Sequence, residues 1–145
     1  MELKKVKVTN FKSIKDSGWI DCENITTLVG VNEAGKSNIL LALWKFNPAK
    51  EGKISFSDDM PVSKFSEFRL LDKKPDFIHC EFEITNKEML EGLSKDFNEE
   101  IEKINTVQIS RDYDGNYSIH FPKAECKTID LKLVVNNLSK KYLEN

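Results

Sequence analysis

The chain has 145 residues, of which 39% are hydrophobic and 32% are charged, and its formal net charge is −2. This balance predicts one globular domain and argues against a chain that binds DNA through excess positive charge alone. No hydrophobic run is long enough to span a membrane, and the first residues lack a signal-peptide core, so we expect a cytoplasmic protein with no membrane partner. Cys22, Cys80 and Cys126 have neither disulfide nor zinc spacing and are expected to be reduced thiols.

The N-terminal part of the chain is predicted to be mostly β-structure. Residues 3–9 predict a first strand, with Val6 and Val8 on its buried face. A polar bend at residues 12–17 and a second short strand at residues 19–22 follow. Residues 25–29 read Ile-Thr-Thr-Leu-Val, and this apolar, β-branched run predicts a buried strand.

Residues 30–37 read Gly-Val-Asn-Glu-Ala-Gly-Lys-Ser and fit the pattern G-x-x-x-x-G-K-[ST]. This Walker A loop, or P-loop, wraps the phosphates of a nucleoside triphosphate, because its glycines allow backbone N–H groups to point inward. Lys36 is expected to reach the β- and γ-phosphates, and Ser37 is expected to bind a Mg²⁺ ion that bridges them. The sequence therefore predicts a nucleotide-binding site.

The loop has the context that the pattern requires, which is a strand before it and a helix after it. Apolar side chains recur three or four apart over residues 36–46 and predict a helix, which Asn47-Pro48 ends. Such a helix directs its positive dipole end at bound phosphates. We expect Leu40 and Leu43 to be buried against the sheet. A plain glycine turn between two core elements is the alternative, and the complete pattern in this register disfavours it.

The middle of the chain predicts a connection, a strand and a helix. Residues 51–74 are rich in Gly, Pro, Ser, Asp and Lys, which favours a long surface connection. Apolar and polar side chains alternate over residues 77–84, which predicts a strand with one solvent-exposed face. Apolar residues three or four apart over about 87–104 predict a helix that covers the sheet.

The last predicted elements are a hairpin and a strand. Asp114-Gly115 predicts the turn of a hairpin over about 106–121. Arg111 in this hairpin is either a surface charge or a contact to DNA or nucleotide. Residues 129–135 suggest one more strand. Together the elements predict an α/β fold, with helices packed on a mixed sheet.

Asn32 and Asn38 extend the loop to G-x-N-x-x-G-K-S-N, and an upstream strand leads into Asn10-Phe11-Lys12-Ser13. These stretches resemble the ABC-type AAA ATPases that act on DNA, namely the structural maintenance of chromosomes (SMC) proteins, the RecF-like repair ATPases and the OLD (overcoming lysogenisation defect) family of ATP-dependent nucleases. Residues 57–61 and 75–84 are similar to the first lobe of OLD proteins. The resemblance implies a P-loop NTPase, the first lobe of an ABC-type ATPase with antiparallel β-hairpins and a P-loop helix.

The resemblance also implies the ligands, ATP and Mg²⁺, with Lys36 in a catalytic role as well. The residues expected to bind them are Lys12, Ser13, Gly30, Asn32, Glu33, Ala34, Gly35, Lys36, Ser37 and Asn38. Lys12 and Ser13 are either nucleotide contacts or part of a solvated turn, and Asn32 either donates to the γ-phosphate or only shapes the turn. The resemblance implies that the full-length protein is a homodimer or higher oligomer that couples ATP binding to a reaction on DNA. In the OLD family this reaction is DNA cleavage by a C-terminal nuclease domain. The implied biological role is DNA repair or phage defence.

Two features of a hydrolytic ATPase are missing from the sequence. No apolar strand ends in an Asp or Asp-Glu that would hold Mg²⁺ and orient water, and no Leu-Ser-Gly-Gly-type signature occurs. We therefore expect residues 1–145 to be a single N-terminal ATP-binding lobe, a fragment of a longer hydrolase whose C-terminal lobe completes the site. Alone, it is expected to bind ATP without hydrolysing it. The alternative is a non-hydrolytic nucleotide-binding interaction module that uses ATP only to set its conformation.

Overall fold

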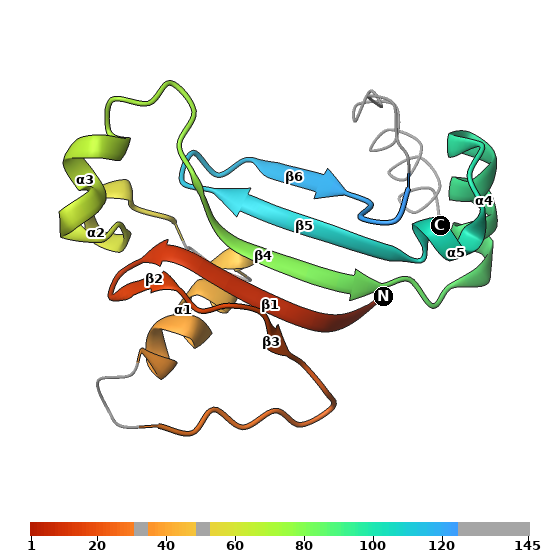
Figure 1. Ribbon diagram of the computed structural model, residues 1–145, viewed down its shortest axis with the longest axis horizontal. Coiled ribbons are helices and arrows are strands. Elements are labelled where there is room, and N and C mark those ends of the chain that lie inside the picture. Colours follow the sequence, from red (N-terminus) through yellow and green to blue (C-terminus); the bar gives the residue numbers. More distant parts are fainter. Residues whose placement is uncertain (31–34, 49–52, 125–145) are drawn as a thin grey trace.

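The structure is a computed structural model that describes residues 1–30, 35–48 and 53–124 (Figure 1). These residues form a six-stranded sheet in the order β2-β1-β4-β5-β6, and β3 also pairs with β1. The strands are β1 (Glu2–Phe11), β2 (Ile14–Asp16), β3 (Ile20–Asp21), β4 (Asp76–Glu83), β5 (Thr106–Asp112) and β6 (Tyr117–His120). All pairs between them are antiparallel, so the predicted mixed sheet is an antiparallel one in this part of the α/β fold.

The helices lie at three places around the sheet. They are α1 (Lys36–Phe46), α2 (Phe56–Asp59), α3 (Val62–Phe68), α4 (Lys87–Phe97) and α5 (Ile101–Ile104). Figure 1 shows α2 and α3 at one end of the sheet and α4 and α5 at the other. The α1 helix contacts the central strands β1 and β4. The helix predicted after the P-loop is therefore confirmed, and it packs on the middle of the sheet.

The main core lies between α1 and the paired strands β1 and β4. Val6 pairs with Cys80 and Val8 pairs with Ile78, so the inward positions of the two alternating strands meet across the register. All four side chains are buried. Burial raises the pKa of the Cys80 thiol to about 12, which keeps it protonated and unreactive. The alternation in the sequence thus predicted this core, including its cysteine, correctly.

The helix predicted over about 87–104 is divided into α4 and α5. Asn98 ends α4 in the left-handed conformation, with a φ of 51°, which asparagine tolerates better than most residues. At the other end, the Asn86 side chain accepts a hydrogen bond from the backbone N–H of Met89 and caps α4. The buried residues Leu90, Leu93, Ile104 and Val107 form a second apolar cluster there. The apolar residues of α4 and α5 keep a helical spacing across the end of α4 at Asn98, and for this reason the sequence predicted a single helix.

The prediction of a surface connection over residues 51–74 is wrong in its middle part. This segment contains α2 and α3, and within it Asp59 and Met60 are buried. The Ser55 side chain caps α2 by accepting a hydrogen bond from the backbone N–H of Asp58. Phe56 packs against Phe65 with ring centroids 5.2 Å apart. Scattered aromatic residues therefore anchor a segment whose average composition is that of a loop.

The strand predicted at residues 25–29 is also absent. Ile25 and Val29 are 87% and 89% exposed, and no described strand pairs with this segment. The second predicted strand shrinks to β3, the two residues Ile20–Asp21. A strand needs a neighbour for its backbone N–H and C=O groups, and one edge of β1 is occupied by β4 while the other is shared by β2 and β3. Residue type alone does not show whether such a neighbour exists. The strand predicted at residues 129–135 lies outside the described residues.

The hairpin predicted over about 106–121 is present as β5 and β6, and it holds one end of α1. Asp112 accepts hydrogen bonds from the backbone N–H groups of Asp114 and Asn116, which closes the turn. Arg111 donates to the carbonyls of Lys45 and Phe46 at the C-terminus of α1. A cation at this position satisfies carbonyls that have no partner within a helix. Arg111 is therefore a structural contact of α1 and not a free surface charge.

The two leucines predicted to be buried on α1 differ in the structure. Leu43 packs against the main core, whereas Leu40 is 59% exposed, so that half of the prediction is wrong. Leu43→Ala is expected to lower the free energy of unfolding by about 1–2 kcal/mol, because a partly buried leucine loses part of its transfer free energy. Leu40→Ala is the matched control and should change stability little. Thermal or urea melts of the two variants measure this; equal destabilisation would mean that α1 is rotated relative to the sheet.

Candidate functional site

The site begins at Gly35, the residue that precedes α1. Gly35 has a φ of 81° and forms the N-cap of α1, without any side-chain cap. A Cβ atom at this position would lie 3.2 Å from Ile14 Cγ1 and 3.5 Å from Ser13 Oγ. Glycine is therefore needed twice, because the backbone is left-handed and the turn between β1 and β2 approaches closely. The first turn of α1 contains no acidic residue that would compete with a bound phosphate.

Lys36 is the first residue of α1, and its side chain turns back toward the start of the loop. Its Nζ donates to the carbonyl oxygen of Gly30. This contact links the first glycine of the P-loop pattern to the lysine near its end. Ser37 follows on α1 and is exposed. The predicted site residues Asn32, Glu33 and Ala34 lie outside the described residues.

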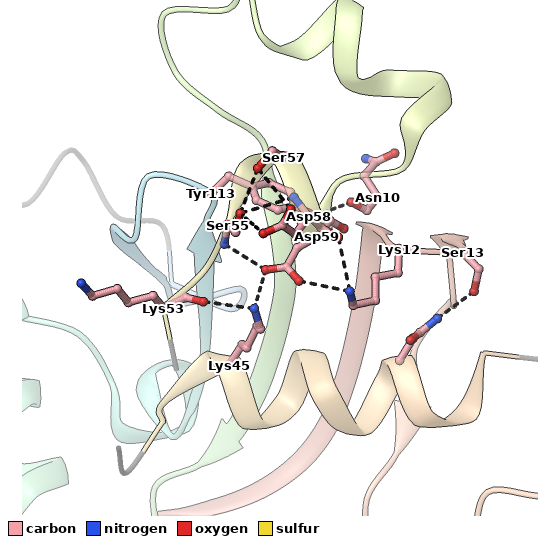
Figure 2. Close-up of polar contacts among 11 residues, drawn as sticks. Asn10, Lys12, Ser13, Lys45, Lys53, Ser55, Ser57, Asp58, Asp59 and Tyr113 are labelled. Carbon is pink, nitrogen blue, oxygen red and sulfur yellow. Dashed lines mark hydrogen bonds and ion pairs between the residues drawn. The ribbon is translucent and has the colours of Figure 1, made fainter. Parts of the chain in front are cut away.

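Lys12 and Ser13 come from the turn between β1 and β2, far from the P-loop in the sequence. Asn38 on α1 donates through Nδ2 to Ser13 Oγ at 2.9 Å, a contact drawn in Figure 2. Ser13 therefore lies beside Gly35 and is hydrogen-bonded to the first turn of α1. The structure brings together Ser13, Gly35 and Asn38, as the resemblance implies, while the binding of nucleotide by these residues stays a prediction.

A buried carboxylate beside this turn was not predicted from the sequence. Asp59, at the end of α2, is 2% exposed, and its side chain pairs with Lys45 of α1. The same carboxylate lies 3.5 Å from the Nζ of Lys12. It also accepts a hydrogen bond of 2.9 Å from the backbone N–H of Ser55 (Figure 2). Two lysines from different elements thus converge on one carboxylate next to the candidate site.

Tyr113 closes this cluster from the strand side. Its hydroxyl lies 2.6 Å from the carbonyl of Asn10 and 3.1 Å from the carbonyl of Asp59. Burial, together with the charge of Asp59, raises the pKa of the Tyr113 hydroxyl, so it remains a hydrogen-bond donor at any physiological pH. The sequence signal at this cluster was the family resemblance of residues 57–61, which does not pair Asp59 with lysines distant in the chain.

Two other kinds of site are absent from the part of the chain that the structure describes. No group of three or more His, Cys, Asp or Glu side chains there is placed to hold a metal ion. Among the described helices, none has both the length and the apolar character needed to cross a membrane. The P-loop region is therefore the strongest candidate for a functional site.

Comparison with protein-family models agrees with the P-loop pattern. The AAA ATPase domain model matches residues 1–144. Uncharacterized protein MJECL44 of Methanocaldococcus jannaschii is 39% identical over 114 residues, which cover 70% of this chain and 33% of that protein, so the chain spans about a third of its length. A solved chain described under "Structural biochemistry of ATP-driven dimerization and DNA stimulated activation of SMC ATPases" aligns with a TM-score of 0.44 and 16% identity, over 96% of this chain and 78% of that chain. Because the family match spans nearly every residue, the chain belongs to the AAA ATPase domain family.

Proposed function

We propose that the chain is an ATP-binding lobe and that its site is formed by the P-loop and the turn between β1 and β2. The observation that carries this is the start of α1, where a buried left-handed glycine is followed by a lysine whose Nζ donates to the carbonyl of Gly30. Membership of the AAA ATPase domain family implies nucleotide binding. The N-terminus of an eleven-residue helix, with no side-chain cap, suits a phosphate group.

Each described site residue has a role that its chemistry supports. Lys36 supplies a point charge for the β- and γ-phosphates, and Gly35 allows the backbone to approach them. Ser37 is exposed at the first turn of α1, where its hydroxyl suits a Mg²⁺ ion bound to the same phosphates. Bound Mg²⁺ would neutralise phosphate charge. Ser13 and Lys12 would form the wall of the site beside Gly35, and Asn38 would keep Ser13 in place.

In the longer protein, we propose that this lobe belongs to an ABC-type ATPase of the OLD, RecF or SMC kind, located in the cytoplasm. The support is the G-x-N-x-x-G-K-S-N loop, the preceding Asn-Phe-Lys-Ser stretch and the much longer relative from M. jannaschii. A C-terminal lobe and a second subunit would complete the ATPase, and DNA would be its substrate. A non-hydrolytic nucleotide-binding module remains the competing function, since the sequence contains no acidic strand end for hydrolysis.

The Mg²⁺ role of Ser37 gives a direct test of the site. Ser37→Ala is expected to weaken the binding of ATP measured with Mg²⁺ present, by roughly tenfold, because one oxygen ligand is lost. Binding of ATP measured with a chelator should change little. Calorimetric titration under the two conditions separates these effects. The neighbouring exposed Leu40 provides the control variant, Leu40→Ala, which should bind ATP like the wild type; an equal loss with and without Mg²⁺ in Ser37→Ala would remove the metal role.

A further inference from the structure

The turn between β1 and β2 has an unusual backbone. Asn10 and Lys12 both have a φ of 49°, which is the left-handed region. Asparagine occupies this region with some ease, whereas a lysine there is strained by about 1 kcal/mol or more. Such a conformation persists only where surrounding contacts hold it, and it often occurs beside functional sites. Phe11, between the two residues, is fully buried and stacks on Phe77 at 5.5 Å. The contacts that hold Lys12 are therefore of functional interest.

The end of α2 provides those contacts. The backbone N–H of Lys12 donates to the Asp59 carbonyl at 2.6 Å, and its Nζ donates to the Asp58 carbonyl at 3.3 Å. The same Nζ lies 3.5 Å from Asp59 Oδ1. One short segment thus holds both the backbone and the side chain of the strained residue. On the other side of the turn, Ser13 and Ile14 lie against Gly35 of the P-loop.

The ion pairs show why Asp59 does more than neutralise a buried lysine. Lys45 alone would neutralise the charge of the Asp59 carboxylate, since the Lys45 side chain is 12% exposed and in direct contact with that carboxylate. The second lysine, Lys12, has a side chain that is 32% exposed and comes from the turn. Asp59 therefore connects three elements, α1, α2 and the β1–β2 turn, and it reaches the turn through Lys12, the residue before Ser13 (Figure 2).

We propose that Asp59 is a positioning residue for nucleotide binding and that it acts through Lys12. Its carboxylate fixes the Lys12 side chain, its carbonyl fixes the Lys12 backbone, and the turn held in this way forms the wall beside Gly35. This inference rests on the proposed function, because the consequence of positioning is ATP affinity. It assigns a functional role to a residue that lies outside the P-loop pattern.

The test compares two variants of the Asp59–Lys45 ion pair: one removes the negative charge and the other removes the positive charge. Asp59→Asn keeps the size of the side chain and removes the charge that holds Lys12, and it is expected to weaken ATP binding roughly tenfold. Lys45→Gln removes the other partner and leaves Lys12 paired with Asp59. It is expected to lower the melting temperature while ATP affinity stays near that of the wild type. Calorimetric titration with ATP and Mg²⁺ measures the affinities, and thermal melts confirm that each variant is folded.

This pair of variants distinguishes positioning from a simple field effect. If the cluster acted only through its charge, removing the carboxylate would tighten the binding of anionic ATP and removing Lys45 would weaken it. Either of those results, or an unchanged affinity in Asp59→Asn, overturns the inference. In a Lys12→Ala background, Asp59→Asn should cause no further loss of affinity, because its effect passes through Lys12. A full additional loss would also overturn it.

Two further outcomes are covered by the same experiment. If Asp59→Asn does not fold, Asp59→Glu takes its place, since it keeps the charge for Lys45 but displaces the carboxylate by one methylene group. This variant should also bind ATP more weakly, and wild-type affinity in it would overturn the inference. If the wild type itself binds no ATP, the proposed function fails and the inference fails with it. Wild-type binding with normal affinity in the Asp59 variants rejects the positioning role alone.

Discussion

Replacing Lys36 by alanine is expected to abolish ATP binding, with a loss of affinity of about a hundredfold or more. Lys36 is the first residue of α1, and its Nζ donates to the Gly30 carbonyl. Triphosphate oxygens would gain charge-assisted hydrogen bonds from this ammonium group, each worth about 1.5–3 kcal/mol. Alanine retains the helix and removes every one of these bonds. Isothermal titration of ATP with Mg²⁺ into both proteins measures the effect.

A second lysine variant controls for the change in net charge. Lys64 lies on α3, is paired with Glu67 on the same helix and takes no part in the proposed site. Lys64→Ala should therefore bind ATP as the wild type does. Because Lys36 also contacts Gly30, melting curves should accompany the titration and show that the variant is folded. Equal ATP affinity in wild type and Lys36→Ala would reject the P-loop as the binding site.

The part of the site that could be predicted from sequence is the part that is local in the chain. Gly35, Lys36 and Ser37 are neighbours, and each residue type has a direct chemical reason at its position. The helix that follows is also encoded locally, by apolar spacing. The left-handed backbone of Gly35 is what this pattern requires. The contact of Ser13 with Asn38 joins distant residues and was not predicted; the family resemblance implied only that Ser13 lies beside the nucleotide.

The cluster around Asp59 could not be predicted for the same reason. Its partners Lys12 and Lys45 lie on different elements, and no local pattern pairs them. The segment around Asp59 also has the composition of a loop, so its short helices and its burial were both missed. Burial of an Asp is favourable only when cations and N–H groups surround it, and that arrangement exists only in the folded chain.

The failed strand at residues 25–29 shows the opposite error. Here local residue type was read correctly as suitable for a strand, yet the described structure offers it no neighbouring strand. Strand formation depends on pairing, so β propensity describes a preference that tertiary structure must satisfy. By contrast, β1 and β4 alternate over longer stretches and pair with each other in register. Their positions were therefore predicted well.

Residues 1–145 are expected to bind ATP without measurable turnover, even with Mg²⁺ and DNA present. Phosphoryl transfer to water requires a positioned water and stabilisation of the charge that develops on the phosphate. The sequence supplies the phosphate cradle, but no apolar strand ends in an acidic residue and no signature loop is present. The buried carboxylate beside the Lys12 turn, Asp59, is already engaged by two lysines and does not face an open site where water could be positioned. A phosphate-release assay over many equivalents of ATP measures the rate.

The Lys36→Ala variant provides the background for this assay, because contaminating ATPases would be unaffected by the substitution. Repeated turnover that disappears in Lys36→Ala would contradict the prediction and show that the lobe holds a catalytic base. Glu33 within the loop and Asp59 would then be the first residues to replace, by glutamine and asparagine respectively. If the lobe alone does not hydrolyse ATP and a longer protein that contains it does, the proposal of an active site completed by a second lobe and a partner subunit is supported. Such a division follows from the chemistry, because the P-loop binds and orients the phosphates while hydrolysis depends on groups that face them from the opposite side.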